Sequence, residues 1–130
     1  MAKIKVLLDT NFLLTMVRQK IHGLEEISQK FPAEYYTLSR VLYEIKGLAR
    51  GDKKITNEAK IVEQVLKNNN VKVLDSTAED VDSEMARLAG EGYVIATNDK
   101  FLRQRVKKAG GKTIFIRSLT YIDAEEVIGE

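Results

Sequence analysis

Hydrophobic and polar residues follow two different periodicities along the chain. Short runs of five to seven residues rich in Val, Ile, Leu and Tyr are typical of buried strands. Longer segments in which apolar residues recur every three or four positions are typical of helices. We predict strands at residues 3–9, 34–39, 71–75, 93–99 and 112–118. We predict helices at residues 11–20, 23–31, 40–50, 57–70, 77–92 and 100–111.

Capping and turn residues mark where the predicted helices begin and end. Ser39 is placed to cap the third predicted helix, and Gly51 lies just past its end. Ser76 and Glu79 have the spacing of a capping box, which would start the fifth predicted helix near Thr77.

The alternation of strands with helices predicts the fold class. Connections of this kind build an α/β fold, a three-layer sandwich in which a central parallel sheet of four to five strands is flanked by helices. A chain of 130 residues can bury a hydrophobic core, and we expect one domain that covers residues 1–130. With no secretory signal and no apolar run of about 18 residues, we expect a cytoplasmic protein without a membrane partner.

The first and fourth predicted strands each end on an aspartate, Asp9 and Asp99. Ligands of parallel α/β sheets bind at the carboxyl ends of the strands, so the two carboxylates meet at one edge if these strands are neighbours. Each aspartate also stands where Asp commonly caps a helix. The pattern therefore leaves two interpretations, a binding site and an ordinary cap.

A third carboxylate, Glu44, lies in phase with the apolar residues of its predicted helix. We expect it to point with them toward the sheet. An unpaired carboxylate is costly there and needs a basic side chain or a metal ion as its partner. The apolar residues of this helix are Val41, Leu42, Ile45, Leu48 and Ala49.

Two aspartates in the helix at residues 77–92 compete for a fourth position. Asp80 lies on a helical row that contains only charged residues, and we expect this row to face solvent. Asp82 lies at the edge of the apolar row, past the first turn, where it is not needed as a cap. We choose Asp82 and keep Asp80 as the alternative. The charged row consists of Asp80, Glu84, Arg87 and Glu91.

Composition narrows the chemistry of such a site. The chain has no cysteine and one histidine, His22, which lies in a polar stretch and is expected to be an ordinary surface residue. Thiol catalysis, thiolate zinc sites and disulfides are thereby excluded, and a Ser-His-Asp triad is disfavoured. Four carboxylates cannot all stay ionised together without cations, and an all-oxygen site favours Mg²⁺ or Mn²⁺ over Zn²⁺.

Charge is unevenly spread, although the formal net charge is only +2. Residues 100–117 contain no acid, whereas residues 118–130 contain no base. The basic block suits a polyanion, although a solvated helix face has the same pattern. Divalent ions beside such a block suggest phosphodiester hydrolysis, in which the metal acidifies the attacking water. The candidate residues for binding a polyanion such as RNA are Lys100, Arg103, Arg105, Lys107 and Lys108.

Four stretches of the chain together resemble the PIN-domain ribonuclease family from end to end. They read VLLDTNFLL, TLSRVLYEIKGLARG, DSEMARLA and VIATNDKFLRQRVKKAGGKTIFIR. The resemblance implies an α/β fold around a parallel sheet, a carboxylate site that binds Mg²⁺ or Mn²⁺, cleavage of single-stranded RNA and, in many members, a homodimer. The catalytic and metal-binding acids of the family match Asp9, Glu44, Asp82 and Asp99.

Neighbouring positions refine this match. Ile45 stands where the family commonly has Leu after its glutamate, and VDSEM stands where many relatives carry a pair of aspartates. The resemblance also implies that polar residues around the first and fourth acids orient the carboxylates or contact the water of the site. They are Thr10, Asn11, Thr97 and Asn98.

Within the family, ATNDKFLRQRVKKAGG followed by IFIR is similar to archaeal relatives of the small-subunit ribosomal-RNA processing nuclease. This similarity favours RNA processing, with a ribosomal-RNA precursor among the candidate substrates. A VapC-type toxin, which would pair with an antitoxin, is the second interpretation, and a catalytically weak RNA-binding assembly module is the third. A response-regulator-like receiver or phosphatase is disfavoured, because two adjacent acids do not follow the first strand.

Overall fold

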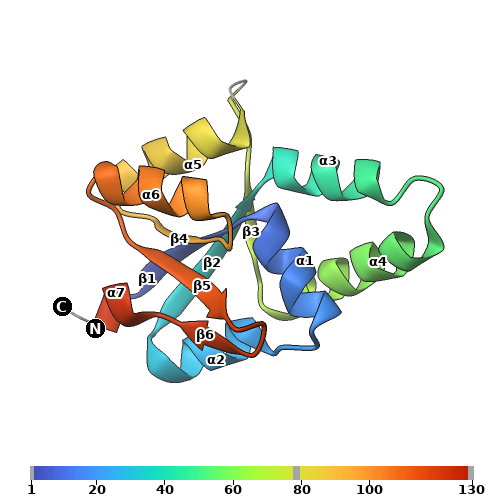
Figure 1. Ribbon diagram of the computed structural model, residues 1–130, viewed down its shortest axis with the longest axis horizontal. Helices are drawn as coiled ribbons and strands as arrows, with labels where there is room; N and C mark the ends of the chain where they lie inside the picture. Colours follow the sequence, from blue (N-terminus) through green and yellow to red (C-terminus); the bar gives the residue numbers. More distant parts are fainter. Residues whose placement is uncertain (1, 78–79, 129–130) are drawn as a thin grey trace.

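The computed structural model describes residues 2–77 and 80–128, and its centre is a six-stranded sheet in the order β3-β2-β1-β4-β5-β6 (Figure 1). The first five strands pair in parallel, and β6 runs antiparallel to β5. The α/β fold with a central parallel sheet is confirmed, and the sheet is one strand larger than the predicted maximum. The strands are β1 (Ile4–Leu8), β2 (Ala33–Leu38), β3 (Lys72–Leu74), β4 (Val94–Ala96), β5 (Thr113–Arg117) and β6 (Tyr121–Asp123).

The six predicted helices are all present, and a short seventh helix follows β6. Neither β6 nor this last helix is among the predicted elements, because three or four residues are too few for a periodicity to be recognised. The helices are α1 (Thr10–Arg18), α2 (Gly23–Lys30), α3 (Ser39–Leu48), α4 (Lys53–Asn68), α5 (Val81–Gly90), α6 (Lys100–Lys108) and α7 (Glu125–Ile128).

The starts of α3 and α4 differ from the predicted ones. α4 begins earlier because Asp52 caps it, accepting hydrogen bonds from the backbone N–H groups of Lys54 and Ile55. The prediction that Ser39 caps α3 is wrong, because Ser39 is the first residue of the helix itself. Its hydroxyl oxygen instead accepts a hydrogen bond from the backbone N–H of Ser76, which ties the start of α3 to the segment that leads to α5.

The strand order reverses at the pair formed by β1 and β4. From β1 the sheet adds β2 and β3 on one side, and it adds β4 and β5 on the other. Because crossovers between parallel strands are right-handed, α1 to α4 cover one face of the sheet and α5 and α6 cover the other. Consistent with this, α4 packs on α1 and α3, while α5 packs on α6 (Figure 1). Sheets of this kind bind ligands where the strand order reverses.

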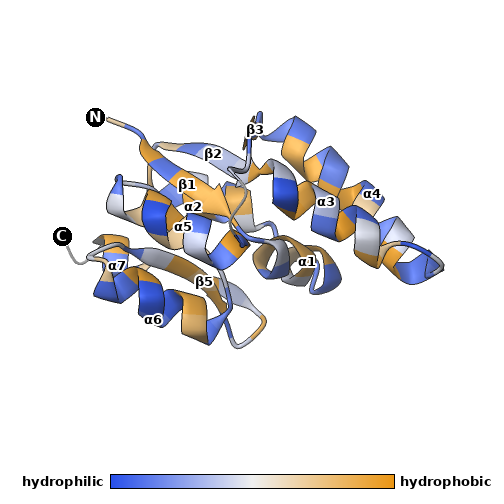
Figure 2. Cartoon of the chain, turned by 90° about the horizontal axis from the view of Figure 1, so that it is seen from above, coloured by the Kyte–Doolittle hydropathy of each residue, from blue (hydrophilic) through white to orange (hydrophobic). Residues whose placement is uncertain are grey.

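The central strand lies in a dry core. Val6, Leu7 and Leu8 have no exposed surface, and the hydrophobic β1 runs through the middle of the molecule in Figure 2. α6 contributes Leu102 and Val106 to the core and is otherwise mostly hydrophilic (Figure 2). Within the two described ranges, no helix is both long and apolar enough to cross a membrane.

Two glycines should respond in opposite ways to the same substitution. A Cβ atom at Gly111, between α6 and β5, would lie 2.8 Å from the Ala89 Cβ and 2.9 Å from a Val106 methyl group. Gly111→Ala should therefore destabilise the protein by about 1–3 kcal/mol through overpacking. At Gly47, inside α3, an added Cβ would meet no atom within 4 Å apart from the backbone of its own helix, so Gly47→Ala should stabilise the protein by roughly 0.5–1 kcal/mol. Urea unfolding measures both, and a neutral Gly111→Ala would contradict the close packing of α6.

Candidate active site

The pairing of β1 with β4 brings Asp9 and Asp99 to the same edge of the sheet. Leu8 lies opposite Ala96, so the two strands leave the sheet side by side. Asp9 is the N-cap of α1, and Asp99 is the N-cap of α6, where its carboxylate accepts a hydrogen bond from the Leu102 N–H at 3.0 Å. Each aspartate therefore caps a helix and also faces the edge where ligands of such sheets bind.

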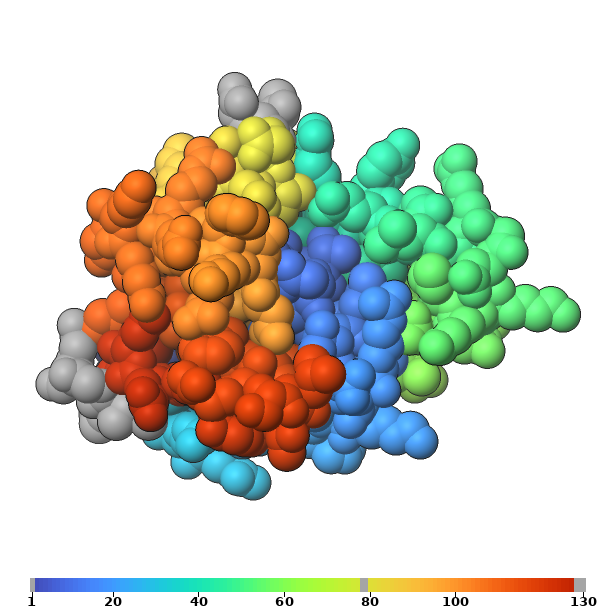
Figure 3. Space-filling view, in the orientation of Figure 1, coloured from blue at the N-terminus to red at the C-terminus, as the bar shows by residue number. Residues whose placement is uncertain are grey.

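All four acids that the sequence suggests line one cleft of about 320 Å³. They come from the end of β1, the end of β4, α3 and α5, so the cleft lies between the two helix layers. In Figure 3, blue residues of the early chain lie between the orange residues of α6 and the teal residues of α3. The cleft is lined by Asp9, Thr10, Asn11, Leu14, Thr15, Arg18, Glu44, Leu48, Val81, Asp82 and Asp99.

The prediction that Glu44 is buried is wrong. Glu44 is exposed on the rim of the cleft, because α3 packs along a narrower row than the predicted apolar stripe. Val41 and Ile45 are buried, whereas Leu48 is 49% exposed. The Glu44 carboxylate accepts a hydrogen bond from the Thr10 hydroxyl at 3.0 Å, which holds it against the start of α1.

α5 begins at Val81, not near Thr77, because Asp80 is its N-cap. The Asp80 carboxylate accepts hydrogen bonds from the backbone N–H and the hydroxyl of Ser83, both at 2.8 Å, and these bonds lower its pKa. The predicted capping box therefore does not start this helix, and its second member, Glu79, lies outside the described residues.

Asp82 lies in the first turn of α5, half-buried in the wall of the cleft. It is not past the first turn, since the helix starts later than predicted, but it is free of the capping role, as predicted. Burial raises the pKa of its carboxyl, and the charge of Asp99 raises it further. The prediction that Glu84 faces solvent is wrong. Glu84 is only 3% exposed, and its carboxylate accepts hydrogen bonds from the backbone N–H and the hydroxyl of Thr77.

Asp9 is buried at the bottom of the cleft, with 5% of its surface exposed. Its carboxylate accepts hydrogen bonds from the Thr97 hydroxyl at 2.7 Å and from the Thr10 backbone N–H at 2.8 Å. Burial nevertheless raises its pKa to about 6, and the charges of Asp82 and Glu44 add to the rise. Above that pH the Asp9 carboxylate adds its negative charge to those of Asp82 and Glu44.

Arg18 lines the same cleft, but its charge is already shared. Its Nε donates to both carboxylate oxygens of Glu58, at 3.0 and 3.1 Å, and this contact joins α1 to α4. Arg18 is not among the residues predicted from the sequence, although spacing gives a signal: Asn11, Thr15 and Arg18 follow one face of the helix that begins beside Asp9. Its side chain nevertheless stays 42% exposed.

The donors in the cleft fit a hard divalent cation. Four carboxylates supply only oxygen, and a bound Mg²⁺ or Mn²⁺ would relieve the repulsion that contributes to the raised pKa values of Asp9 and Asp82. Within residues 2–77 and 80–128, no three acidic side chains already stand close enough to bind one ion directly. An ion that keeps part of its water shell, as Mg²⁺ usually does, needs fewer direct carboxylate ligands.

The four polar residues named with the acids divide into two pairs. Thr10 and Thr97 contact the carboxylates directly. Asn11 accepts a hydrogen bond from the Asn98 backbone N–H at 2.9 Å, and the Asn98 side chain exchanges two hydrogen bonds with the backbone of Ile116 in β5, at 2.9 and 3.1 Å. The threonines thus orient acids, whereas the asparagines fix the backbone that carries the fourth acid.

The five basic residues predicted to bind RNA lie along α6, and three of them already have partners within the protein. The guanidinium carbon of Arg103 lies 3.5 Å from the centre of the Phe115 ring. Lys100 and Lys108 are exposed. The basic face of α6 therefore both holds the helix in place and presents positive charge. The two remaining contacts join Arg105 to Ser83 and Lys107 to Glu126.

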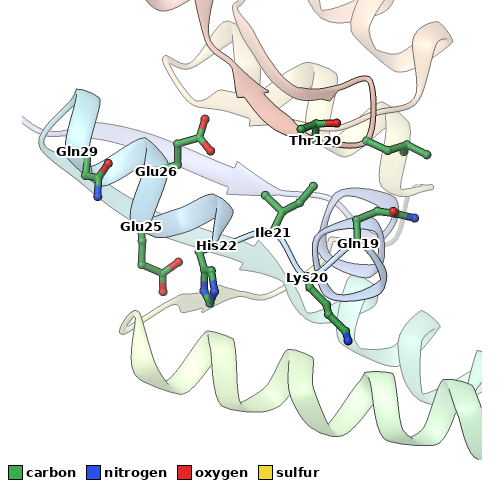
Figure 4. A pocket seen from close by; sticks show the side chains of 9 residues that line it. Gln19, Lys20, Ile21, His22, Glu25, Glu26, Gln29 and Thr120 are labelled. Carbon is green, nitrogen blue, oxygen red and sulfur yellow. The ribbon is translucent and has the colours of Figure 1, made fainter.

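A second hollow, of about 430 Å³, contains the histidine of the chain (Figure 4). Its wall comes from the segment between α1 and α2, from α2, and from the turn before β6 (Figure 4). Glu26 is engaged there, because it accepts a hydrogen bond from the Ile122 backbone N–H at 2.8 Å. His22 is exposed, as predicted for an ordinary surface residue. The four-acid cleft remains the candidate for chemistry.

Removing the charge of Asp9 should stabilise the metal-free protein. Its pKa is raised from 3.8 to about 6, so the folded state loses stability as the pH rises through this interval and does not regain it above. Asp9→Asn should therefore be more stable than the parent by about 1–3 kcal/mol near pH 8, at about 1.4 kcal/mol per pH unit between the two pKa values. Near pH 4 the difference should vanish. Urea unfolding in EDTA at both pH values measures this, and a variant less stable than the parent at pH 8 would contradict it.

Comparison with known proteins identifies the family of the chain. The chain matches the family described as "PIN like domain" over residues 6–119. Ribonuclease VapC4 of Methanocaldococcus jannaschii is 27% identical over 124 residues, which cover 92% of this chain and 95% of that protein.

Solved structures share the fold at lower identity. The PIN domain endonuclease Utp24 superposes with a TM-score of 0.75 and 22% identity, over 94% of this chain and 91% of that one. A domain of a functionally unknown protein from Methanocaldococcus jannaschii gives 0.62 and 18%, over 90% and 93%. A PilT N-terminus domain protein from Sulfolobus solfataricus gives 0.52 and 12%, over 89% and 90%. The family match covers α3, α5 and β4 completely and β1 from Val6 onward, so it contains all four acids. Because it spans most of the sequence, this chain belongs to the PIN-like domain family.

Proposed function

We propose that this chain is a metal-dependent endoribonuclease that hydrolyses phosphodiester bonds of single-stranded RNA in the four-acid cleft. The observation that carries the proposal is the meeting of four carboxylates from four different elements where the strand order reverses. Membership of the PIN-like domain family and similarity to a relative named as a ribonuclease support the same activity. The catalytic and metal-binding residues of the proposal are Asp9, Glu44, Asp82 and Asp99.

Mg²⁺ or Mn²⁺ is the proposed cofactor, held by these four carboxylates. The ion would supply a more acidic attacking water and a positive charge for the scissile phosphate. The chain prepares this site through Thr97 and Thr10, whose hydroxyls hold the Asp9 and Glu44 carboxylates in place. Since these hydrogen bonds exist before any ligand arrives, little reorganisation is needed when RNA binds.

Positive charges beside the cleft offset the repulsion between its acids and the RNA backbone. Lys100 begins α6 directly after Asp99, and the exposed part of Arg18 lines the cleft itself. Lys108 extends the positive surface along the helix, while the other basic residues of α6 contribute charge from fixed positions. Each contact to a phosphate would release counterions and make binding weaker at high salt.

We assign this cleavage to RNA processing in the cytoplasm, by a homodimer, with a ribosomal-RNA precursor among the candidate substrates. A VapC-type toxin with an antitoxin partner is the second candidate, and similarity to the VapC4 ribonuclease favours it. Production in a heterologous bacterium distinguishes the two, because a toxin arrests growth unless its partner is present. A catalytically weak RNA-binding module would bind an unstructured RNA but would not cut it in Mn²⁺ or Mg²⁺.

Cleavage should depend on a divalent ion and on the buried acid. The parent should cut an unstructured RNA in Mn²⁺ or Mg²⁺, lose this activity in EDTA and regain it when the ion is restored. Asp9→Asn should lower the rate roughly 100-fold or more, because the site loses a ligand of the ion that stabilises charge at the reacting phosphate. Glu25→Gln, an exposed acid on α2, serves as the matched control and should cut at the parent rate. Cleavage that resists EDTA, or none across several RNAs and both metals, would count against the proposal.

The two aspartates at the start of α5 should separate activity from stability. Asp82→Asn should reduce cleavage and Mn²⁺ affinity while leaving the fold at least as stable, because its carboxyl is destabilised by burial and by Asp99. Asp80→Ala should keep the parent activity but lose about 0.5–2 kcal/mol of stability with the helix cap. Cleavage rates and urea unfolding of both variants decide, and a larger loss of cleavage in Asp80→Ala would reverse the assignment.

A further inference from the structure

A third hollow opens directly beside the four-acid cleft, at the start of α3. This α3 hollow has a volume of about 630 Å³. Glu44 lines both the α3 hollow and the cleft, so the two share a wall. An RNA strand that left the cleft past Glu44 would therefore enter the α3 hollow. Its lining residues are Ser39, Arg40, Tyr43, Glu44 and Ser76.

Tyr43 presents an uncovered aromatic ring in the α3 hollow. It is 74% exposed, and among the described residues its hydroxyl has no hydrogen-bond partner. Helical side chains lean toward the helix N-terminus, so residues one turn later are placed to cover the ring. They are Lys46, which is itself exposed, and Gly47, which has no side chain. The Tyr43 ring therefore stays open to a ligand.

A positive charge accompanies this ring. Arg40 lies one turn before Tyr43, is exposed, and has no ion-pair partner within residues 2–77 and 80–128. Its backbone N–H donates to the Ser76 hydroxyl at 3.0 Å, and this bond fixes the backbone from which both side chains extend. An aromatic ring and a guanidinium thus line one hollow next to Glu44, on a helix whose start is tied to Ser76.

We propose that the α3 hollow is a nucleotide subsite of the RNA strand, in which one base stacks on Tyr43 and an adjacent phosphate contacts Arg40. The inference rests on the proposed ribonuclease function and adds the path that the strand takes beyond the cleft. Stacking on aromatic rings combined with positive charge is how proteins hold single strands without reading their sequence. Because paired and stacked bases offer no free face to a ring, the subsite selects single-stranded RNA.

The surroundings of Tyr43 favour a nucleotide over a protein partner. Protein interfaces are built around a core of several apolar side chains that exclude water together. The residues one turn away from Tyr43 along α3 are instead Ser39, Arg40, Lys46 and Gly47. A single ring among polar and basic residues matches a base and a phosphate.

The test combines a protein variant with a modified RNA. Short unstructured RNAs, each with one abasic nucleotide at a different position, are cut in Mn²⁺ and bound in EDTA. For the parent, one position near the cleavage site should lower kcat/KM and affinity by about 5- to 100-fold, as the loss of one stacked base does. Tyr43→Ala should show the same loss on intact RNA and no further loss at that position. Tyr43→Phe should behave like the parent, and Arg40→Ala should reduce the salt slope of log affinity by about 0.7.

Tyr121→Ala is the matched control, because Tyr121 is 46% exposed on β6, at the far side of the sheet from β2 and α3. It should bind and cut RNA like the parent. Parent-like behaviour of Tyr43→Ala, or an equal abasic penalty in parent and Tyr43→Ala, would overturn the subsite alone. A change of oligomeric mass in Tyr43→Ala with RNA affinity unchanged would assign the ring to a protein interface. A parent that cuts no RNA would instead remove the proposed function, and the subsite with it.

Discussion

The parallel pairing of β1 with β4 is the constraint on which the cleft depends. Because Leu8 lies opposite Ala96, the Thr97 hydroxyl comes within 2.7 Å of the Asp9 carboxylate. A register shift of one residue would turn Thr97 to the other face of the sheet and leave a buried carboxylate without this donor. The geometry of the acids and the order of the strands are therefore a single property of the fold, set by contacts between segments distant in sequence.

Helix starts make this crowding of acids tolerable. Asp9 and Asp99 cap α1 and α6, and Asp82 lies in the first turn of α5, so three carboxylates stand at the positive ends of helices. Glu44 lies inside α3 and has no such support, which is why its hydrogen bond from Thr10 matters. The remaining repulsion between the acids and the burial of Asp9 lower the stability of the folded state. A bound cation would relieve both effects.

Sequence patterns locate the acids well and their surroundings less well. The ends of β1 and β4 are recognisable because strands buried on both faces read as continuous apolar runs, so Asp9 and Asp99 stand out. Helical phase indicates which side of α3 carries Glu44, but it does not tell how wide the packed row is, and the predicted burial fails for that reason. The start of α5 depends on which of two nearby residues caps the helix, and Asp80 does so instead of Ser76. The role of Asn98 depends on where β5 lies, which no local pattern reveals.

The short outer strands of the sheet limit how copies of this chain can associate. Both outer strands, β3 and β6, are only three residues long, and β6 runs against its neighbour. Edges this short offer an incoming strand few backbone partners, which protects the sheet from growing by addition of further chains. The homodimer proposed above would consequently have to form through side chains away from the sheet edges, where surface substitutions can alter it without disturbing the sheet.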